Sequence, residues 1–289
     1  MKQIAGIAAT VVFVLSLMSA CCSIAPMSPQ EAAEVQLKAA DTLGIPVEKT
    51  LPRSGIVLRL IPAGAVRMGD PDIANAWPDN EILQETRLTK PFYLGEYEVT
   101  QEQWRKVMGS NPAHFKEAGV NAPVECVSWH DCTNFMAKLA ELEDMSERSF
   151  RLPTEAEWEY ACRAGTQTKY CYGHYLDSGM ANFAGAYLSG EEQVGEFREK
   201  TMPAGQFKPN AWGLYDMHGN VSEWCADWYG DYERCATDPR GAASGSYRVI
   251  RGGSWKSIAE HCGSAYRYGC NPDQVSDRIG FRLSMTAGR

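Results

Sequence analysis

The sequence predicts a mixed α+β domain with little regular secondary structure, and three observations support this. Glycine turns, aromatic residues and a few polar groups are concentrated in three blocks, residues 213–224, 251–255 and 279–282. The composition, with 26 Gly, 15 Pro, 8 Trp and 13 Tyr, is typical of turns and aromatic packing rather than of long helices. Short apolar strands are interspersed with short capped helices and long turn-rich connections, which is the pattern of an α+β domain.

Several short strands are expected in the first half of the main domain, which begins near Gly55. Residues 56–61 form a branched apolar run closed by a Pro-Ala-Gly turn, and residues 65–68 continue it. Residues 86–99 are expected to form a pair of strands around Pro91.

Three helices are expected from capping patterns. Thr100 begins a short helix that ends at Gly109, Ser128 begins a second, and Thr154-Glu-Ala-Glu157 is a full capping box for a third. One face of the second helix recurs at helical spacing and is expected to be core; its members are Trp129, Cys132, Phe135, Met136 and Leu139. Short strands are expected before the second and third helices, at residues 123–126 and 150–152.

The N-terminus is expected to be an export signal. Residues 1–20 combine a charged start with an apolar run and end in small residues before Cys21, as in bacterial lipoprotein signals. We expect Cys21 to be lipidated, which would anchor the protein in the cell envelope, in the periplasm or at the outer membrane; a plain secretory signal is the alternative. Residues 21–54 form a leader with a helix over 28–43, begun by Ser28-Pro-Gln-Glu31.

The charge and the cysteines limit the kinds of partner and site. The net charge is −8 and the basic residues form no run, so a nucleic-acid partner is not expected. An exported protein with eight cysteines beyond Cys21 and Cys22 is expected to form disulfides, and the sequence does not assign their pairing. These eight are Cys126, Cys132, Cys162, Cys171, Cys225, Cys235, Cys262 and Cys270. No spacing typical of a zinc site is present.

A series of blocks, in order along the chain, resembles the formylglycine-generating enzyme, or sulfatase-modifying factor, family. The blocks are Ile61-Pro-Ala-Gly64, Tyr97-Glu-Val-Thr-Gln101, Val127-Ser-Trp129, residues 151–160 and the three C-terminal blocks. The resemblance covers residues 55–285 and implies a complex C-type-lectin-like α+β fold. It also implies an activity: oxidation by oxygen of a cysteine in a partner protein, such as an exported sulfatase, to formylglycine.

The resemblance implies a copper(I) site made of two cysteines five positions apart after the Gly-Gly-Ser block. Copper(I) is a soft ion that prefers thiolates. Counted from Ser254, the second cysteine is Cys262, but Ser257 occupies the first position. Counted from Tyr266-Arg-Tyr268, the two positions hold Glu260 and Ala265. Copper binding is therefore not supported by the residues.

The resemblance also implies calcium sites. One is matched by Asp216 and Glu223 through their side chains and by Gly219 and Val221 through their carbonyl groups. Hard cations such as Ca²⁺ prefer oxygen ligands of this kind. The alternative is a glycine turn whose acids cap nearby amides. A second site is matched by Asn182 and the carbonyl of Phe183, with a further ligand near Glu196.

Three residues near these blocks have open roles. Cys262 and Ser254 are candidate catalytic residues by resemblance; Cys262 as half of a disulfide, and Ser254 as a turn residue, are the alternatives. His218 lies in the glycine turn and is expected to be exposed or to cap a backbone group.

Two functions follow from these expectations. The first is an oxidoreductase of the formylglycine-generating type. The second is a non-catalytic, calcium-stabilised lectin-like module that binds a glycan, peptide or protein through residues 255–278.

Overall fold

The structure is a computed structural model and describes residues 24–70, 83–185, 195–232 and 236–287. The helices are α1 (Pro29–Leu43), α2 (Gln101–Met108), α3 (Trp129–Leu142) and α4 (Glu155–Arg163), with 3-10 turns η1 (Lys116–Ala118) and η2 (Ala259–Cys262). The strands are β1 (Glu48–Thr50), β2 (Val57–Ile61), β3 (Gly64–Met68), β4 (Gln84–Leu88), β5 (Phe92–Gly95), β6 (Phe150–Arg151), β7 (Ser222–Trp228), β8 (Arg248–Arg251), β9 (Arg267–Cys270), β10 (Ile279–Gly280) and β11 (Ser284–Thr286). The elements are short and few, as expected.

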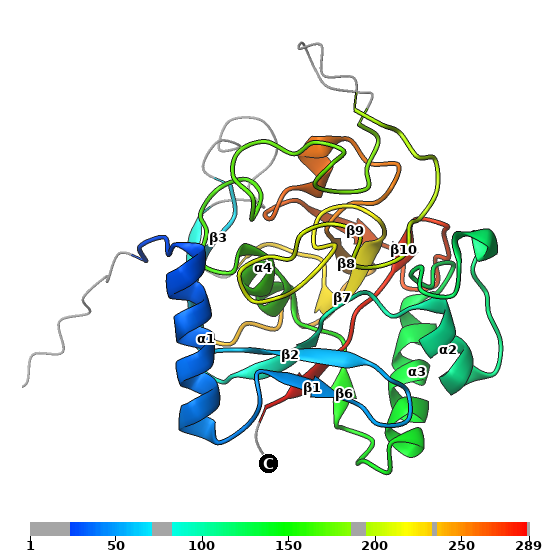
Figure 1. The fold of residues 1–289 in the computed structure, drawn as a ribbon, viewed down its shortest axis with the longest axis horizontal. Coiled ribbons are helices and arrows are strands. Elements are labelled where there is room, and N and C mark those ends of the chain that lie inside the picture. Colours follow the sequence, from blue (N-terminus) through cyan, green and yellow to red (C-terminus); the bar gives the residue numbers. More distant parts are fainter. Residues whose placement is uncertain (1–23, 71–82, 186–194, 233–235, 288–289) are drawn as a thin grey trace, which may run out of the picture.

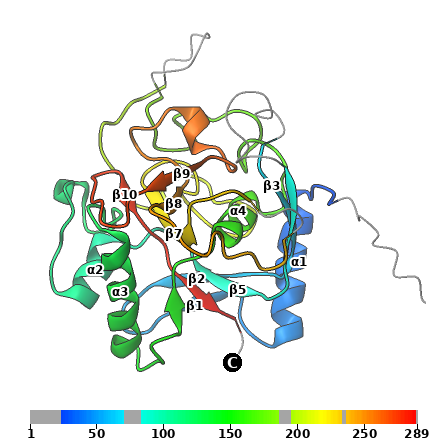
Figure 2. The same ribbon diagram turned by 180° about the vertical axis from the view of Figure 1, so that it is seen from behind.

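Two small sheets and a hairpin organise the chain. The larger sheet has the strand order β1-β2-β5-β11-β6, so the C-terminal strand β11 lies between β5 and β6. A second sheet has the order β10-β7-β8-β9, in which β10 runs parallel to β7. Helix α1 lies at one end of the larger sheet, and α2 and α3 lie at the other (Figures 1 and 2). The C-terminal blocks thus supply the second sheet and complete the first.

Helix α1 packs against the domain instead of extending away from it. Its capping box on Ser28 and its left-handed C-cap at Gly44 match the expected limits of residues 28–43. The buried Gln36 side chain donates to the Leu60 carbonyl at 2.8 Å and to the Trp212 carbonyl at 3.0 Å. The Trp212 indole in turn donates to the Ala32 carbonyl at 2.9 Å. These contacts fix the leader helix to β2 and to the residue just before the first C-terminal block.

The capping patterns at Thr100, Ser128 and Thr154 are confirmed, since each forms a capping box in the structure. The expected core face of α3 is also confirmed. Cys132, Phe135, Met136 and Leu139 are buried, and Trp129 is half-buried. The Phe135 ring stacks on Trp104 of α2 with ring centroids 5.2 Å apart and meets Phe281 edge-on at 5.3 Å. Aromatic packing therefore joins α2, α3 and the last C-terminal block.

One strand prediction is wrong. Residues 123–126 form only an isolated bridge between Pro123 and Thr100, and Cys126 has a left-handed backbone with φ of 59°, which ends any extended run. The two strands expected around Pro91 are confirmed as β4 and β5. They do not pair with one another: β4 pairs with β3, while β5 pairs with β2 and β11.

The expected signal sequence over residues 1–20, Cys21, Cys22 and Cys235 lie outside the described residues. Within the described ranges, no helix has the length and apolar character needed to cross a bilayer.

Candidate functional site

The first and second C-terminal blocks meet at their glycines. The Gly219 amide donates to the Gly252 carbonyl at 2.7 Å, and the Asn220 amide donates to the Asn182 carbonyl at 2.7 Å. Gly219 has φ of 90°, and a Cβ atom there would lie 2.3 Å from the Asn182 carbonyl oxygen. Only glycine permits this approach. The glycine turn therefore brings the two expected calcium sites side by side.

The Glu223 carboxylate forms an ion pair with a buried arginine. Its carboxylate accepts from the Arg282 guanidinium at 2.6 and 2.7 Å and from the Trp158 indole at 2.7 Å. Arg282 comes from the third C-terminal block, and its remaining bonds go to the carbonyls of Gly95, Glu96 and Tyr215. The pair is fully buried. Such a pair is strongly oriented, because breaking it would leave a charge without a partner.

Two more buried carboxylates adjoin this pair. Asp216 accepts from the Gly205 amide at 2.7 Å. Glu98 accepts from the Val221 amide at 3.0 Å and from the Asn220 side chain at 2.7 Å. Burial raises the pKa of Asp216 to about 6, with Glu223 adding to the rise. Burial, then Asp216 and Glu223, raise the pKa of Glu98 well above its ordinary value. Negative charge thus exceeds the single guanidinium in this cluster.

The second expected site has an amide oxygen without a partner. Asn182 is buried, and its Oδ1 atom has no hydrogen-bond donor. Its Nδ2 atom donates to the Lys200 carbonyl at 2.9 Å and to Asn220 Oδ1 at 3.1 Å. The segment containing Glu196 therefore passes close to Asn182, although the Glu196 side chain is mostly exposed and pairs with Arg198 at 2.9 Å.

The oxygen atoms of these carboxylates and of the Asn182 amide are ligands of the kind that a hard cation prefers. The excess of buried carboxylates and the unpartnered Asn182 oxygen both favour a bound positive charge with oxygen ligands. In the part of the chain that the structure describes, no three His, Cys, Asp or Glu side chains are arranged to hold a metal ion by themselves. A calcium ion here would therefore need carbonyl ligands, as the resemblance implies for Gly219, Val221 and Phe183.

Cys262 is fully buried in an apolar cluster. Its neighbours there are Tyr170, Leu176, Ala181, Phe183 and Ala259. A Cβ atom on Gly253 would lie 2.6 Å from the Cys262 sulfur, so the Gly-Gly-Ser turn packs directly on the thiol. Burial raises the pKa of Cys262 far above its ordinary value, and Glu260 adds to the rise. The environment favours the neutral thiol rather than the thiolate that copper or a nucleophilic reaction requires.

Ser254 makes local turn contacts. It is buried, its amide donates to Ser257 Oγ at 3.0 Å, and its Oγ atom lies 3.2 Å from Ser257 Oγ. The Ser257 amide donates to the Ser254 carbonyl at 2.9 Å. These are the bonds of a serine turn. The position that would hold the first copper ligand is thus occupied by a hydroxyl that stabilises the turn.

Of the two roles expected for His218, exposed residue or backbone cap, the second is confirmed, because the ring is buried and binds backbone groups. Its Nδ1 atom lies 2.7 Å from the Cys262 carbonyl, and its Nε2 atom accepts from the Cys171 amide at 3.1 Å. A carbonyl only accepts, so Nδ1 carries the proton and the ring is neutral. His218 therefore links the glycine turn to the segment around Cys262.

The expected disulfides are not present in the described residues. The seven cysteines there are free thiols: Cys126, Cys132, Cys162, Cys171, Cys225, Cys262 and Cys270. Cys162 contacts Ser264 Oγ at 3.6 Å and His218 Nε2 at 3.8 Å. Four of the thiols have no exposed surface, so they act here as small apolar core residues.

Sequence reasoning missed Glu98 and a second buried charge network. Glu98 lies within a block that carries the family resemblance, and its position two residues before the Thr100 cap is the signal that was available. In the second network, Glu155 and Glu159 of α4 bind Arg251 of β8 at 3.2 and 2.5 Å. Both charge networks join α4 or its neighbours to the C-terminal blocks, so they hold the loops of the site in place.

Comparison with known proteins agrees with this architecture. Residues 47–287 match the sulfatase-modifying factor enzyme 1-like domain. The chain is 34% identical over 222 residues to the formylglycine-generating enzyme of Streptomyces coelicolor, which covers 73% of this chain and 66% of that enzyme. It is 40% identical over 168 residues to the serine/threonine-protein kinase pkn1 of Chlamydia caviae, covering 56% of this chain and only 24% of the kinase. The chain thus spans about a quarter of that relative.

A solved structure supports the fold. The Treponema denticola variable protein 1 superposes with a TM-score of 0.70 at 31% sequence identity, covering 84% of this chain and all of that one. The expected C-type-lectin-like α+β fold is confirmed. With the family domain matched over residues 47–287, the chain belongs to the formylglycine-generating enzyme, or sulfatase-modifying factor, family.

Proposed function

We propose that this chain is a non-catalytic member of its family, a calcium-stabilised binding module that recognises a protein or peptide. One observation carries the proposal: Cys262 is fully buried under Gly253 with a raised pKa, and Ser257 stands five residues before it. A copper(I) site needs two thiolates that can be reached by the ion. This chain offers a buried thiol and a hydroxyl at those positions.

The proposed calcium ions are structural. Asp216 and Glu223, with the carbonyl groups of Gly219 and Val221, would hold one ion. Asn182 and the Phe183 carbonyl, with Glu196, would contribute to the second. The ions would offset the excess negative charge of the cluster and fix the glycine turn. They supply no catalytic chemistry in this proposal.

The proposed binding surface is the exposed part of residues 255–278. Tyr268 of the edge strand β9 is 57% exposed and Val275 is 50% exposed, and Lys256, His261 and Arg278 of the same segment are also exposed. Exposed aromatic and basic side chains are typical of protein-binding surfaces. We propose that the partner is another protein of the cell envelope, where the lipid on Cys21 would hold this chain.

Oxidation of a partner cysteine to formylglycine is the second candidate function. Its support is the 34% identity over 222 residues with a formylglycine-generating enzyme. An exported sulfatase would then be the partner, and copper the cofactor.

A peptide assay separates the two functions. Purified protein, copper and oxygen are incubated with a peptide carrying a Cys-x-Pro-x-Arg motif, with the Streptomyces coelicolor enzyme as the positive control. We expect no mass change on the peptide cysteine. Conversion by this chain, lost in Cys262→Ser, would establish the oxidase and end the proposal of a non-catalytic module.

Binding is tested by incorporating a photo-crosslinking amino acid at position 268 of the protein expressed in its host bacterium. The same residue at position 37, where Leu37 is exposed on α1, serves as control. We expect a protein captured only from position 268 to bind the purified chain directly, and Tyr268→Ala to weaken that binding at least tenfold. Equal binding by the variant, or binding to an oligosaccharide array in place of any protein, would overturn the proposed partner.

A further inference from the structure

Two cysteines meet at one imidazole ring. The Cys162 Sγ atom, in the last turn of α4, lies 3.8 Å from His218 Nε2, and the Cys171 amide donates to the same nitrogen at 3.1 Å. The Cys162 sulfur and the Cys171 backbone can be no further apart than the sum of these two contacts. In a disulfide the two Cα atoms are about 4.4 to 6.8 Å apart, a separation that this shared contact permits.

The Cys171 thiol also bonds the His218 ring. The other ring nitrogen, Nδ1, lies 2.7 Å from the Cys262 carbonyl and is therefore occupied. Nε2 is the nitrogen that remains for the thiol, so both sulfur atoms lie on the same side of the ring. The rings of Tyr170 and Tyr172 meet the imidazole at centroid distances of 5.5 and 5.6 Å and hold it in this orientation.

The two thiols differ in their access to solvent. Both are free in the structure. Cys162 has no exposed surface, whereas Cys171 is half-buried and lines a cavity of about 690 Å³ beside Tyr172, Met180 and Lys208. Cavities of about 300 to 1,000 Å³ admit small molecules. A small reagent can therefore reach Cys171 first, and Cys162 is the second thiol beside it.

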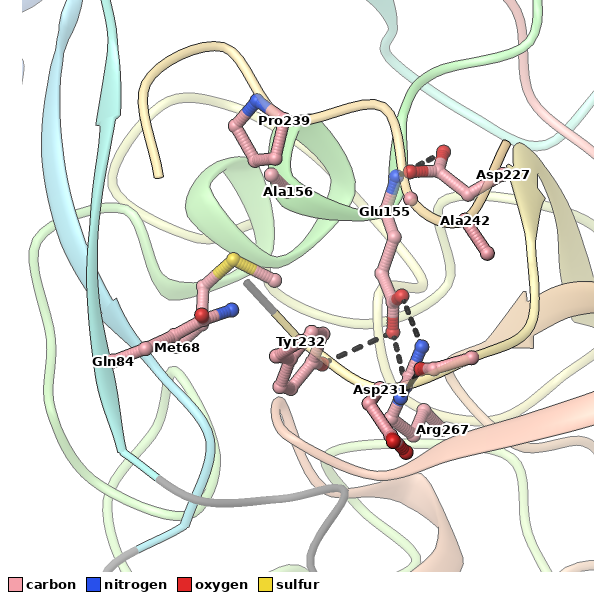
Figure 3. A pocket seen from close by; sticks show the side chains of 12 residues that line it. Met68, Gln84, Glu155, Ala156, Asp227, Asp231, Tyr232, Pro239, Ala242 and Arg267 are labelled. Atoms are coloured by element: carbon pink, nitrogen blue, oxygen red, sulfur yellow. Dashed lines mark hydrogen bonds and ion pairs between the residues drawn. The ribbon is translucent and has the colours of Figure 1, made fainter. Parts of the chain in front are cut away.

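The charged side chains of α4 are satisfied by one another. Figure 3 shows the Glu155 carboxylate bonded to Arg267, at 2.7 Å through two nitrogens. Glu159 binds Arg251 at 2.5 Å. The contacts of the Cys162 sulfur are weaker ones of 3.6 to 3.9 Å. Joining the two thiols would therefore disturb weak sulfur contacts and no ion pair of α4.

The protonation of the thiols agrees with this order of reaction. Burial raises the pKa of the Cys162 thiol to about 12. Burial also raises the pKa of Cys171, but contact with His218 opposes that rise. The thiolate is the nucleophilic form of cysteine. Exposure and environment thus both make Cys171 the thiol that reacts first.

We propose that Cys171 is a site of reversible oxidation by peroxide, with Cys162 as its disulfide partner. The Cys171 thiol loses its proton to solvent, and the thiolate attacks one oxygen of hydrogen peroxide. The O–O bond breaks, which leaves Cys171 as a sulfenic acid, and the hydroxide released takes up a proton to form water. The Cys162 sulfur then attacks the Cys171 sulfur. The S–S bond forms as the S–OH bond breaks, and the hydroxyl leaves with the Cys162 proton as a second water.

The test exposes the purified, reduced chain to hydrogen peroxide and maps its disulfides by mass spectrometry. Trypsin places each cysteine in a peptide of its own, residues 152–163 and 170–198, so only a disulfide can join the two peptides. Iodoacetamide in urea blocks the remaining thiols at each time point. We expect the joined pair, two hydrogen atoms lighter than the separate peptides, to be the main disulfide and to disappear on reduction.

Three variants assign the roles of the thiols. Cys171→Ser should leave Cys162 reduced. Cys162→Ser should stop the reaction at the sulfenic acid, so dimedone should label Cys171 at least tenfold more than in the parent; Cys162→Ala gives the same comparison if serine disturbs the core. Cys132→Ser, which changes another fully buried helical thiol, is the matched control and should form the disulfide at the parent rate. Melting curves establish that each variant is folded.

Three outcomes would overturn the proposal. The first is a folded chain in which peroxide oxidises other cysteines while peptides 152–163 and 170–198 stay separate. The second is a disulfide between them that forms no faster in the native chain than in urea, since the native contact would then contribute nothing. The third is equal dimedone labelling of Cys171 in the parent and in both Cys162 variants.

Discussion

The Arg282 guanidinium and the Glu223 carboxylate form a two-pronged ion pair, with nitrogen–oxygen distances of 2.6 and 2.7 Å and no exposure to solvent. The pair joins β7 to the segment between β10 and β11. Among the described residues, Arg282 is the only one whose guanidinium bonds Glu223. It lies within the acidic cluster formed by Glu98, Asp216 and Glu223. The geometry of the glycine turn therefore depends on a residue 59 positions further along the chain.

Loss of Arg282 should be costly. Arg282→Met leaves Glu223 buried with one donor from Trp158 and adds its charge to those of Glu98 and Asp216. Removing one partner of a buried pair costs about 3 to 5 kcal/mol. We expect a loss of that size in the free energy of unfolding, measured with urea. Arg53→Gln breaks a pair with Asp144 whose side chains are 50% and 72% exposed, and it should cost less than about 1 kcal/mol. Similar costs for the two variants would contradict this account.

The pH dependence of stability should reveal Asp227. Its pKa is about 7 in the folded chain, against an ordinary value of 3.8. Between these values the folded protein keeps a proton that the unfolded chain releases, so stability falls as pH rises from about 4 to about 7. Asp227→Asn lacks this penalty. We expect the variant to be more stable than the parent by about 2 to 4 kcal/mol at pH 8, with the difference shrinking toward pH 5.

The control for this experiment is Asp41→Asn, an exposed aspartate in the last turn of α1. Its stability difference from the parent should stay flat over the same pH range. If Asp227→Asn were instead less stable than the parent at pH 8, the carboxylate would have a partner that stabilises its charge, contrary to its raised pKa.

The helices could be predicted because their signals are local in the sequence. The sheet topology could not, because it depends on contacts between distant segments. Each capping box joins a side chain to a backbone group three residues away, so Ser28, Thr100 and Thr154 could be read directly from the sequence. The insertion of β11 between β5 and β6 joins segments more than a hundred residues apart, and no local pattern specifies it. Only the resemblance to a family suggested such a fold.

The candidate site likewise has a part that the sequence predicted and a part that depends on the tertiary fold. The offsets of Asp216 and Glu223 within one turn were readable, and the structure places both in one buried cluster. Their contacts with Glu98 and Arg282 depend on the tertiary fold. The expectation for Cys262 rested on a spacing alone, and a spacing does not say whether a sulfur faces solvent or the core. Burial under Gly253 decided that question.

Alkylation should distinguish the thiols by burial. Cys132, Cys162, Cys225 and Cys262 have no exposed surface, so we expect iodoacetamide to leave them unmodified in the native protein and to modify them in urea. Cys126 is half-buried, but burial and Glu125 raise its pKa to about 12, so it should react slowly. Mass spectrometry of peptides reads each site. A Cys262 that remains blocked in urea until a reductant is added would reveal a disulfide and contradict the free thiol.

Restoring the spacing of the copper ligands should not restore copper binding. Ser257→Cys places a second thiol five residues before Cys262, but Cys262 remains under Gly253 with its raised pKa. We expect no tight copper(I) binding in competition with a colorimetric chelator and no conversion of the Cys-x-Pro-x-Arg peptide. Tight binding of one copper(I) per chain by this variant would mean that the Gly-Gly-Ser turn opens readily.

Calcium removal should weaken the fold. If the ion binds only the folded chain, an excess of calcium of about a hundredfold over Kd adds about 2.7 kcal/mol, equivalent to roughly 5 to 10 °C in Tm for a domain of this size. We expect EGTA to lower Tm by that amount. Asp216→Asn should reduce the response of Tm to EGTA, and Asn182→Leu should reduce the bound calcium measured by elemental analysis. Asp273→Asn should keep the full response. Because Asp216 is buried near Glu98 and Glu223, its neutral variant should also melt higher than the parent once both are free of calcium. An unchanged Tm on chelation, together with no calcium in the purified protein, would contradict the proposed calcium sites. The negative charge of the acidic cluster would then be offset only by bound protons and by Arg282.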